Sequence, residues 1–170
     1  MIAPVRGPFD EPRSAGWRRA LPALSIMAGS AITVWPIIAT FPYLPPFGLM
    51  MLLAWRLVRP DTLAIWAPLP LGLFDDLLSG QPLGSAILLW SICFFVIDLV
   101  DQRLVFRDFW QDWLIASGAL AFGLIAGRLV AVPFGAHVDT VLWVQIMVSM
   151  MLFPLAARLC LWFDRKRVSE

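Results

Sequence analysis

Long apolar segments separated by short polar ones dominate the chain. Prolines, glycines or charged residues delimit six apolar blocks, at residues 21–41, 46–58, 62–78, 83–100, 113–132 and 141–163. A helix needs about 20 apolar residues to cross a hydrocarbon core of about 30 Å. The first block has this length, exceeds the apolar part of a signal peptide, and precedes no convincing cleavage site. It therefore predicts a retained membrane helix.

The second and third blocks are the least regular of the six. The second is short for a crossing and ends at Arg56 and Arg59, which we expect to reach toward the membrane surface. The third contains Pro68 and Pro70, which we expect to kink a helix because proline has no N–H to donate. With both blocks counted as crossings, the pattern predicts an all-α integral membrane protein with a six-transmembrane-helix bundle. Its domain would span 21–163, between basic tails at 1–20 and 164–170.

The distribution of lysine and arginine predicts how this bundle is oriented. With the amino terminus inside, the inner side collects every basic residue except Arg128, which lies in the fifth block. Basic residues accumulate on the cytoplasmic side of membrane proteins. Five crossings, with a re-entrant second block, would instead place one set of basic loops outside. We therefore predict a multi-pass plasma-membrane protein with both termini in the cytoplasm.

Composition narrows the possible functions. Hydrophobic residues make up 60% of the chain and charged residues 15%, against about 45–50% and about 25% in soluble domains. The net charge of +1 gives no indication of nucleic-acid binding. Cys93, Cys160 and the single histidine, His137, are too few for a disulfide framework or a zinc site. No nucleophile accompanies the Asp75–Asp76 pair, and no phosphate-binding glycine loop is present. We expect no metal, no cofactor and no catalytic residues, hence no enzyme.

Charged residues inside the apolar blocks are the most informative positions, because each costs roughly 2.5–3.5 kcal/mol on insertion scales. Gly72, Asp76 and Gly80 are spaced by four, which places them on one face of a helix. Gly84 continues the spacing, although the proline at position 82 is expected to end the helix first. Flanking glycines allow another backbone to approach closely. We hypothesise an ion pair between Asp76 and Arg128, which lies at a similar depth in the fifth block; the alternative is that Arg128 extends alone to the outer surface.

Two further patterns concern packing. Gly123 and Gly127 form a GxxxG match, which permits tight contact between helices and is more often intramolecular than a dimer face. Asp98 and Asp101, near the inner end of the fourth block, are expected either to pair with Arg56 or Arg158 or to be solvated. The candidate site residues are thus structural or partner-packing positions: Gly72, Asp76, Gly80, Gly84, Gly123, Gly127 and Arg128.

The stretch Gly72-x3-Asp76-x3-Gly80-x3-Gly84 resembles the signature of the MreD family of rod shape-determining membrane proteins. The chain length, the number of apolar blocks and the basic carboxyl-terminal tail agree with this family. The motif covers about a tenth of the chain. Asp76 is the acid that matches the family pattern, whereas Asp75 occupies a position that is more often uncharged.

The resemblance implies a non-enzymatic scaffold of the cell-elongation complex in the bacterial plasma (inner) membrane. Such a scaffold would bind an MreC-like single-span protein, along with MreB, RodA, a penicillin-binding protein and membrane lipid, and would help organise lateral peptidoglycan synthesis and rod cell shape. The glycine-bearing third block and the small face of the fifth are the surfaces we expect to pack closely.

The resemblance also implies a fold similar to the S components of energy-coupling-factor transporters, and with it an alternative function. The chain would then be the small-molecule (vitamin-like) substrate-binding subunit of a membrane transporter. The candidates to line its cavity are few: Asp75, Asp76, Gln81, Ser85, Arg128 and His137.

Overall fold

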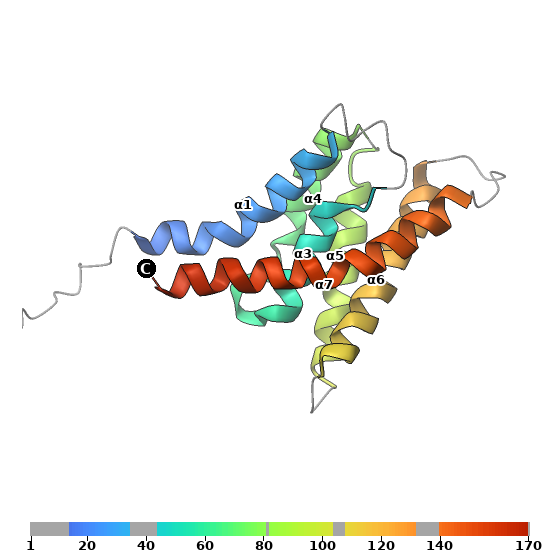
Figure 1. The fold of residues 1–170 in the computed structure, drawn as a ribbon. Coiled ribbons are helices and arrows are strands. Elements are labelled where there is room, and N and C mark those ends of the chain that lie inside the picture. Colours follow the sequence, from blue (N-terminus) through green and yellow to red (C-terminus); the bar gives the residue numbers. More distant parts are fainter. Residues whose placement is uncertain (1–13, 35–43, 81, 104–107, 132–139, 170) are drawn as a thin grey trace, which may run out of the picture.

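The computed structural model describes residues 14–34, 44–80, 82–103, 108–131 and 140–169. These residues form α-helices and one short 3-10 helix, η1, and contain no strand, which confirms the all-α fold class for this part of the chain (Figure 1). In chain order the elements are α1 (Ser14–Val34), α3 (Phe47–Val58), η1 (Pro60–Thr62), α4 (Pro68–Ser79), α5 (Ser85–Asp101), α6 (Phe109–Ala131) and α7 (Thr140–Ser169).

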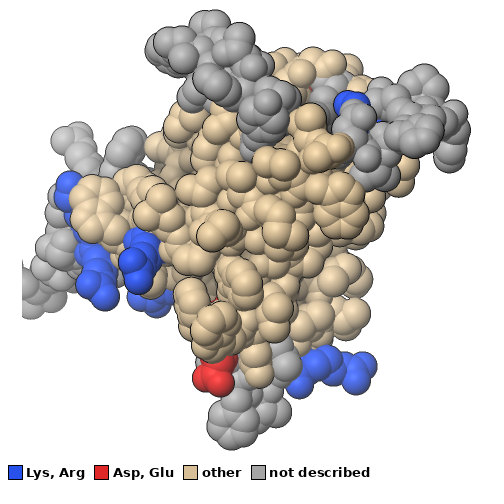
Figure 2. All heavy atoms as spheres, turned by 45° about the vertical axis from the view of Figure 1, so that its right-hand side comes forward, with Lys and Arg blue, Asp and Glu red and all other residues tan. Residues whose placement is uncertain are grey.

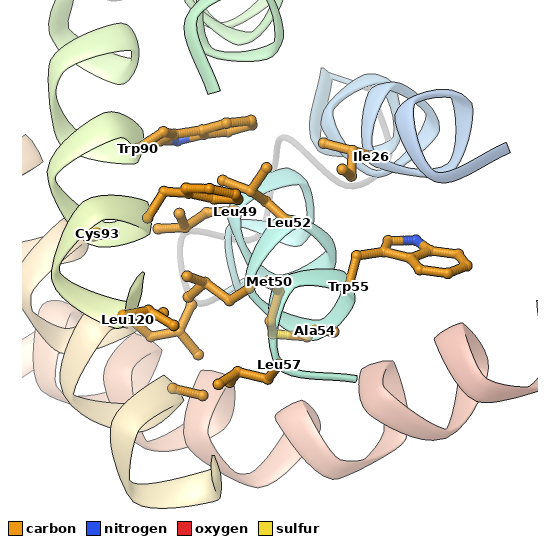
Figure 3. Close-up of a cluster of buried hydrophobic side chains, with 14 of the residues drawn as sticks. Ile26, Leu49, Met50, Leu52, Ala54, Trp55, Leu57, Trp90, Cys93 and Leu120 are labelled. Carbon is orange, nitrogen blue, oxygen red and sulfur yellow. The ribbon is translucent and has the colours of Figure 1, made fainter. Parts of the chain in front are cut away.

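Helix α3 is the centre of the bundle. It packs against α1, α5, α6 and α7, while α4 packs against α1 and α5. The start of α1 and the end of α7 lie on the same side of the molecule (Figure 1). Leu52, Leu53 and Trp55 of α3 are fully buried, and Figure 3 shows the surrounding apolar side chains converging on this helix. A helix that is apolar around its whole circumference is expected in such an enclosed position.

The described helices differ in whether they are long and apolar enough to cross a membrane. Phe109–Val130 of α6 and Thr140–Lys166 of α7 are long and apolar enough to cross a membrane. By contrast, α3 and α4 have 12 residues each, which corresponds to about 18 Å of helix. Six crossings therefore stay a prediction. Figure 2 shows a broad uncharged face, with most of its basic side chains at the left and lower edges.

The prolines of the third apolar block do not kink a helix, so that expectation was wrong. Helix α4 begins at Pro68 and includes Pro70, and residues 63–67 precede it outside any helix. Both prolines lie in the first turn, where the backbone N–H has no intrahelical acceptor, so its absence costs little.

A different proline, Pro154, lies inside α7. Because proline has no N–H, the carbonyl of Met150, four residues earlier, lacks its usual helical donor. The indole Nε1–H of Trp113 on α6 donates to this carbonyl at 2.9 Å. A comparable contact links α1 to α3, where the indole of Trp55 donates to the Ser25 hydroxyl at 2.7 Å. Buried indoles thus connect helices by hydrogen bonds as well as by apolar contact.

Several helix boundaries differ from the apolar blocks. Helix α6 begins at Phe109 instead of 113, and α7 continues to Ser169 instead of 163, so the basic stretch 165–167 is helical. Helix α1 likewise begins at Ser14. Hydropathy marks the part of a helix that is apolar, whereas arginine and lysine, which are good helix formers, extend the helix into polar surroundings. Residues 35–41 of the first block lie outside the described residues.

Candidate functional site

Asp76 caps the amino terminus of α5. The side chain is 1% exposed. Its Oδ1 accepts hydrogen bonds from the Ala86 N–H at 2.8 Å and the Ser85 hydroxyl at 3.0 Å, and its Oδ2 accepts one from the Gly84 N–H at 2.8 Å. The first N–H groups of a helix have no intrahelical acceptor, and a carboxylate also complements the positive end of the helix dipole. Asp76 therefore joins α4 to α5 across the connecting turn.

The three glycines of the motif complete this α4–α5 hairpin. A Cβ on Gly72 would lie 2.8 Å from the backbone N of Ile87, so only glycine allows α4 to contact the start of α5 so closely. Gly80 ends α4 with φ of 66°, and Gly84 precedes α5 with φ of 98°. Both values belong to the left-handed region, which favours glycine. Neither has a heavy atom within 4 Å of its ideal Cβ position, so their role is conformational.

This cap replaces the ion pair that we hypothesised between Asp76 and Arg128. The donors around the Asp76 carboxylate come from residues 84–87. The acid that shares a cavity with Arg128 is instead its neighbour Asp75. Adjacent helical residues point about 100° apart, so one aspartate of the pair faces α5 and the other faces the cavity.

Asp75 also borders a narrow point between helices. An ideal Cβ on Gly48, at the start of α3, would lie 3.3 Å from Asp75 Oδ1 and 2.9 Å from Cη2 of Trp90. The same position would overlap the Ser30 hydroxyl of α1. Side chains from α1, α4 and α5 therefore converge where α3 has none. This convergence was not foreseen, because Gly48 belongs to no spacing pattern in the sequence.

Charged residues at the opposite end of the bundle pair with one another. Arg56 is buried at 5% exposure and donates to Asp98, with Asp101 at 3.8 Å. Of the alternatives left open for these aspartates, pairing with Arg56 is the one that the structure shows. Arg56 is buried, so the expectation that it extends to the membrane surface was wrong. Arg59 is more exposed and binds Asp164 of α7 at 2.9 Å. These contacts join the carboxyl-terminal ends of α3, α5 and α7.

The GxxxG pair of α6 faces the interior. An ideal Cβ on Gly123 would lie 2.8 Å from Cδ2 of Leu49, and one on Gly127 would lie 3.6 Å from Cδ1 of Leu89. Both glycines therefore serve packing within the chain. On another side of α6, Gly118 is exposed and has no heavy atom within 4 Å of its ideal Cβ position. It lines an apolar groove of about 340 Å³ between α5 and α6.

The transporter alternative named six cavity residues, and the structure separates them. Asp75 and Arg128 line the same cavity, whereas Asp76 and Ser85 belong to the helix cap. Gln81 and His137 lie outside the described residues. Among the described residues there is no group of three or more histidine, cysteine or acidic side chains that could hold a metal.

Helices α6 and α7, which are long and apolar enough to cross a membrane, thus belong to an all-helical bundle packed around the enclosed α3. The model of the family described as rod shape-determining protein MreD matches residues 20–163 of the 170 in the chain. The chain belongs to the MreD family, and its role lies in the determination of rod cell shape. No curated protein and no solved structure matches the chain significantly.

Proposed function

We propose that the protein is a non-enzymatic scaffold of the cell-elongation complex in the bacterial inner membrane, where it binds an MreC-like single-span partner. The observation that carries this proposal is the family match over residues 20–163. By holding such a partner, the scaffold would help organise lateral peptidoglycan synthesis. MreB, RodA and a penicillin-binding protein are the further partners that we propose for this assembly.

The apolar groove between α5 and α6 is the surface that we propose for the partner's helix. Its lining includes Ile92 and Val96 of α5 and Leu114, Gly118 and Phe122 of α6. Exposed small residues let a second helix approach closely, and this contact drives helix association in a membrane, where apolar burial contributes little. This assignment moves the partner surface away from Gly123 and Gly127, which face inward.

Copurification with a groove-filling variant tests the partner surface. We expect Gly118→Leu to fill the groove and to reduce recovery of an MreC-like protein with the tagged chain by about tenfold. Such a loss corresponds to about 1.4 kcal/mol of binding free energy. Ala28→Leu is the matched control, because Ala28 is an exposed small residue of α1 away from the groove. Equal recovery with both variants would contradict the groove assignment, and failure of the wild-type chain to recover such a partner would contradict the scaffold itself.

A second candidate function, the substrate-binding subunit of a small-molecule transporter, is favoured by the cavity that Asp75 and Arg128 line. In that case, in-cell crosslinking and mass spectrometry would recover an ATPase pair with a transmembrane coupling subunit. Recovery of cell-wall synthases with a single-span protein would instead support the scaffold.

A further inference from the structure

A cavity of about 250 Å³ lies at the end of the bundle where α3, α5 and α7 begin. This volume corresponds to roughly eight water molecules in the liquid. Asp75 of α4, Arg128 of α6 and Gln145 of α7 give the cavity its polar lining, whereas the remaining walls are apolar or formed by small residues. A concave apolar site with a few convergent polar groups is the usual form of a small-ligand site.

The position of the two charged residues along their helices sets the depth of this cavity. Asp75 lies four residues before the end of α4, and Arg128 lies three residues before the end of α6. At 1.5 Å per residue, both Cα atoms are about 5–6 Å from the helix ends. Because α6 is long and apolar enough to cross a membrane, we place the cavity beside its last turn near the level of lipid headgroups. Ionisable residues in such segments usually face a bundle interior or a polar cavity and mark binding sites.

The α4 side and the α6 side of the cavity carry charged groups of opposite sign. On the α4 side, Asp75 and Trp90 both line the cavity, and Asp75 Oδ1 and the ring atom Cη2 of Trp90 approach the same point beside Gly48. A carboxylate beside an aromatic ring favours an ammonium group. On the α6 side, Arg128 lines the cavity, and a guanidinium can bind a phosphate through two parallel N–H donors.

We propose that this cavity binds an aminoalkyl phosphate, with its ammonium group at Asp75 and Trp90 and its phosphate at Arg128. The headgroup of phosphatidylethanolamine and free phosphoethanolamine share this chemistry. A lipid would place the headgroup in the cavity and leave its acyl chains in the membrane. The proposal goes beyond the scaffold function and does not depend on it.

Native mass spectrometry of the full chain in nanodiscs tests the lipid source. In a mixture of phosphatidylethanolamine and phosphatidylglycerol, we expect the wild type to retain the former preferentially. Asp75→Asn removes the partner of the ammonium group and should abolish this preference, a change of about tenfold. Arg128→Gln should lower the retention of both lipids. Arg103→Gln, at an exposed position outside the cavity, is the matched control and should behave as the wild type.

Phosphoethanolamine added to the detergent-solubilised protein tests the soluble source. A rise in melting temperature that Asp75→Asn and Arg128→Gln each remove would identify a soluble ligand, and lipid retention without this rise would identify a lipid headgroup. Circular dichroism establishes that each variant keeps its helix content. If the wild type shows neither lipid preference nor a thermal shift, or if folded variants keep both, the proposal is wrong.

Discussion

The charged residues at the two ends of the bundle have different surroundings. At the end where α3, α5 and α7 finish, Arg56 pairs with Asp98 and Arg59 pairs with Asp164. At the end where these helices begin, Asp76 is bound to the start of α5, while Asp75 and Arg128 border a cavity. A charge that is enclosed by the bundle is part of the fold, whereas one that lines a cavity can also contact a ligand there. The comparison therefore separates the residues that stabilise the bundle from those that we assign to binding.

The largest expected effect is the loss of the cap at Asp76. Asp76→Ala removes an acceptor that three backbone N–H groups and one hydroxyl of residues 84–87 share, at a position that is 1% exposed. We expect the free energy of unfolding to fall by about 3–5 kcal/mol, because each buried donor that loses its acceptor costs about 1–3 kcal/mol. Steric-trapping or detergent titration of the purified protein measures this change. A loss below about 1 kcal/mol would mean that the cap is replaced by water.

A smaller loss of stability is expected at the end of the bundle where α3, α5 and α7 finish. Arg56→Ala leaves Asp98 and Asp101 close together without their common cation. Because these carboxylates are partly exposed, we expect the free energy of unfolding to fall by about 2–3 kcal/mol, less than for a fully buried pair. Arg59→Ala is the comparison, because the Arg59 side chain is 57% exposed although its partner Asp164 is buried. Water can partly replace an exposed arginine, so we expect this variant to lose less, about 1–2 kcal/mol. Equal losses in the two variants would mean that the exposure of the arginine does not determine how much its ion pair stabilises the bundle.

The α4–α5 hairpin provides the next test. Gly72→Ala places a methyl group 2.8 Å from the backbone of Ile87, so the two helices must separate. We expect a loss of about 1–3 kcal/mol, as for overpacked cores. Gly118→Ala, at a helical position with open space around it, is the control and should be neutral or stabilising by up to about 1 kcal/mol through helix propensity. If both substitutions change the free energy of unfolding in the same direction, the close approach of α4 to α5 does not explain why position 72 is glycine.

The sequence predicted the helical elements better than the contacts between them. Apolar runs located each described helix, because burial and membrane residence both require apolar side chains. Four-residue spacing singled out Gly72 and Asp76 but assigned the wrong partner to Asp76. A helical face shows which residues lie together, and it does not show that the chain will turn back after Gly80 to bring its own next helix to the carboxylate. Arg56 was expected to reach the surface because it lies at the end of an apolar block, with pairing to Asp98 and Asp101 as an alternative. The structure shows the pairing, which hydropathy alone could not select.

The smallest expected effect comes from replacing an aspartate with asparagine, made separately at each end of the bundle. Asp98→Asn weakens the contact with Arg56 and should lower the free energy of unfolding by about 1–2 kcal/mol. Asp75→Asn removes a charge that borders a cavity, so we expect no loss and a gain of up to about 1 kcal/mol, because binding residues are often kept at some expense of stability. Unfolding of both variants in the same detergent, without added lipid, makes the measurement. Equal destabilisation by the two substitutions would mean that Asp75 is a structural residue like Asp98, and the distinction between the two ends would then fail.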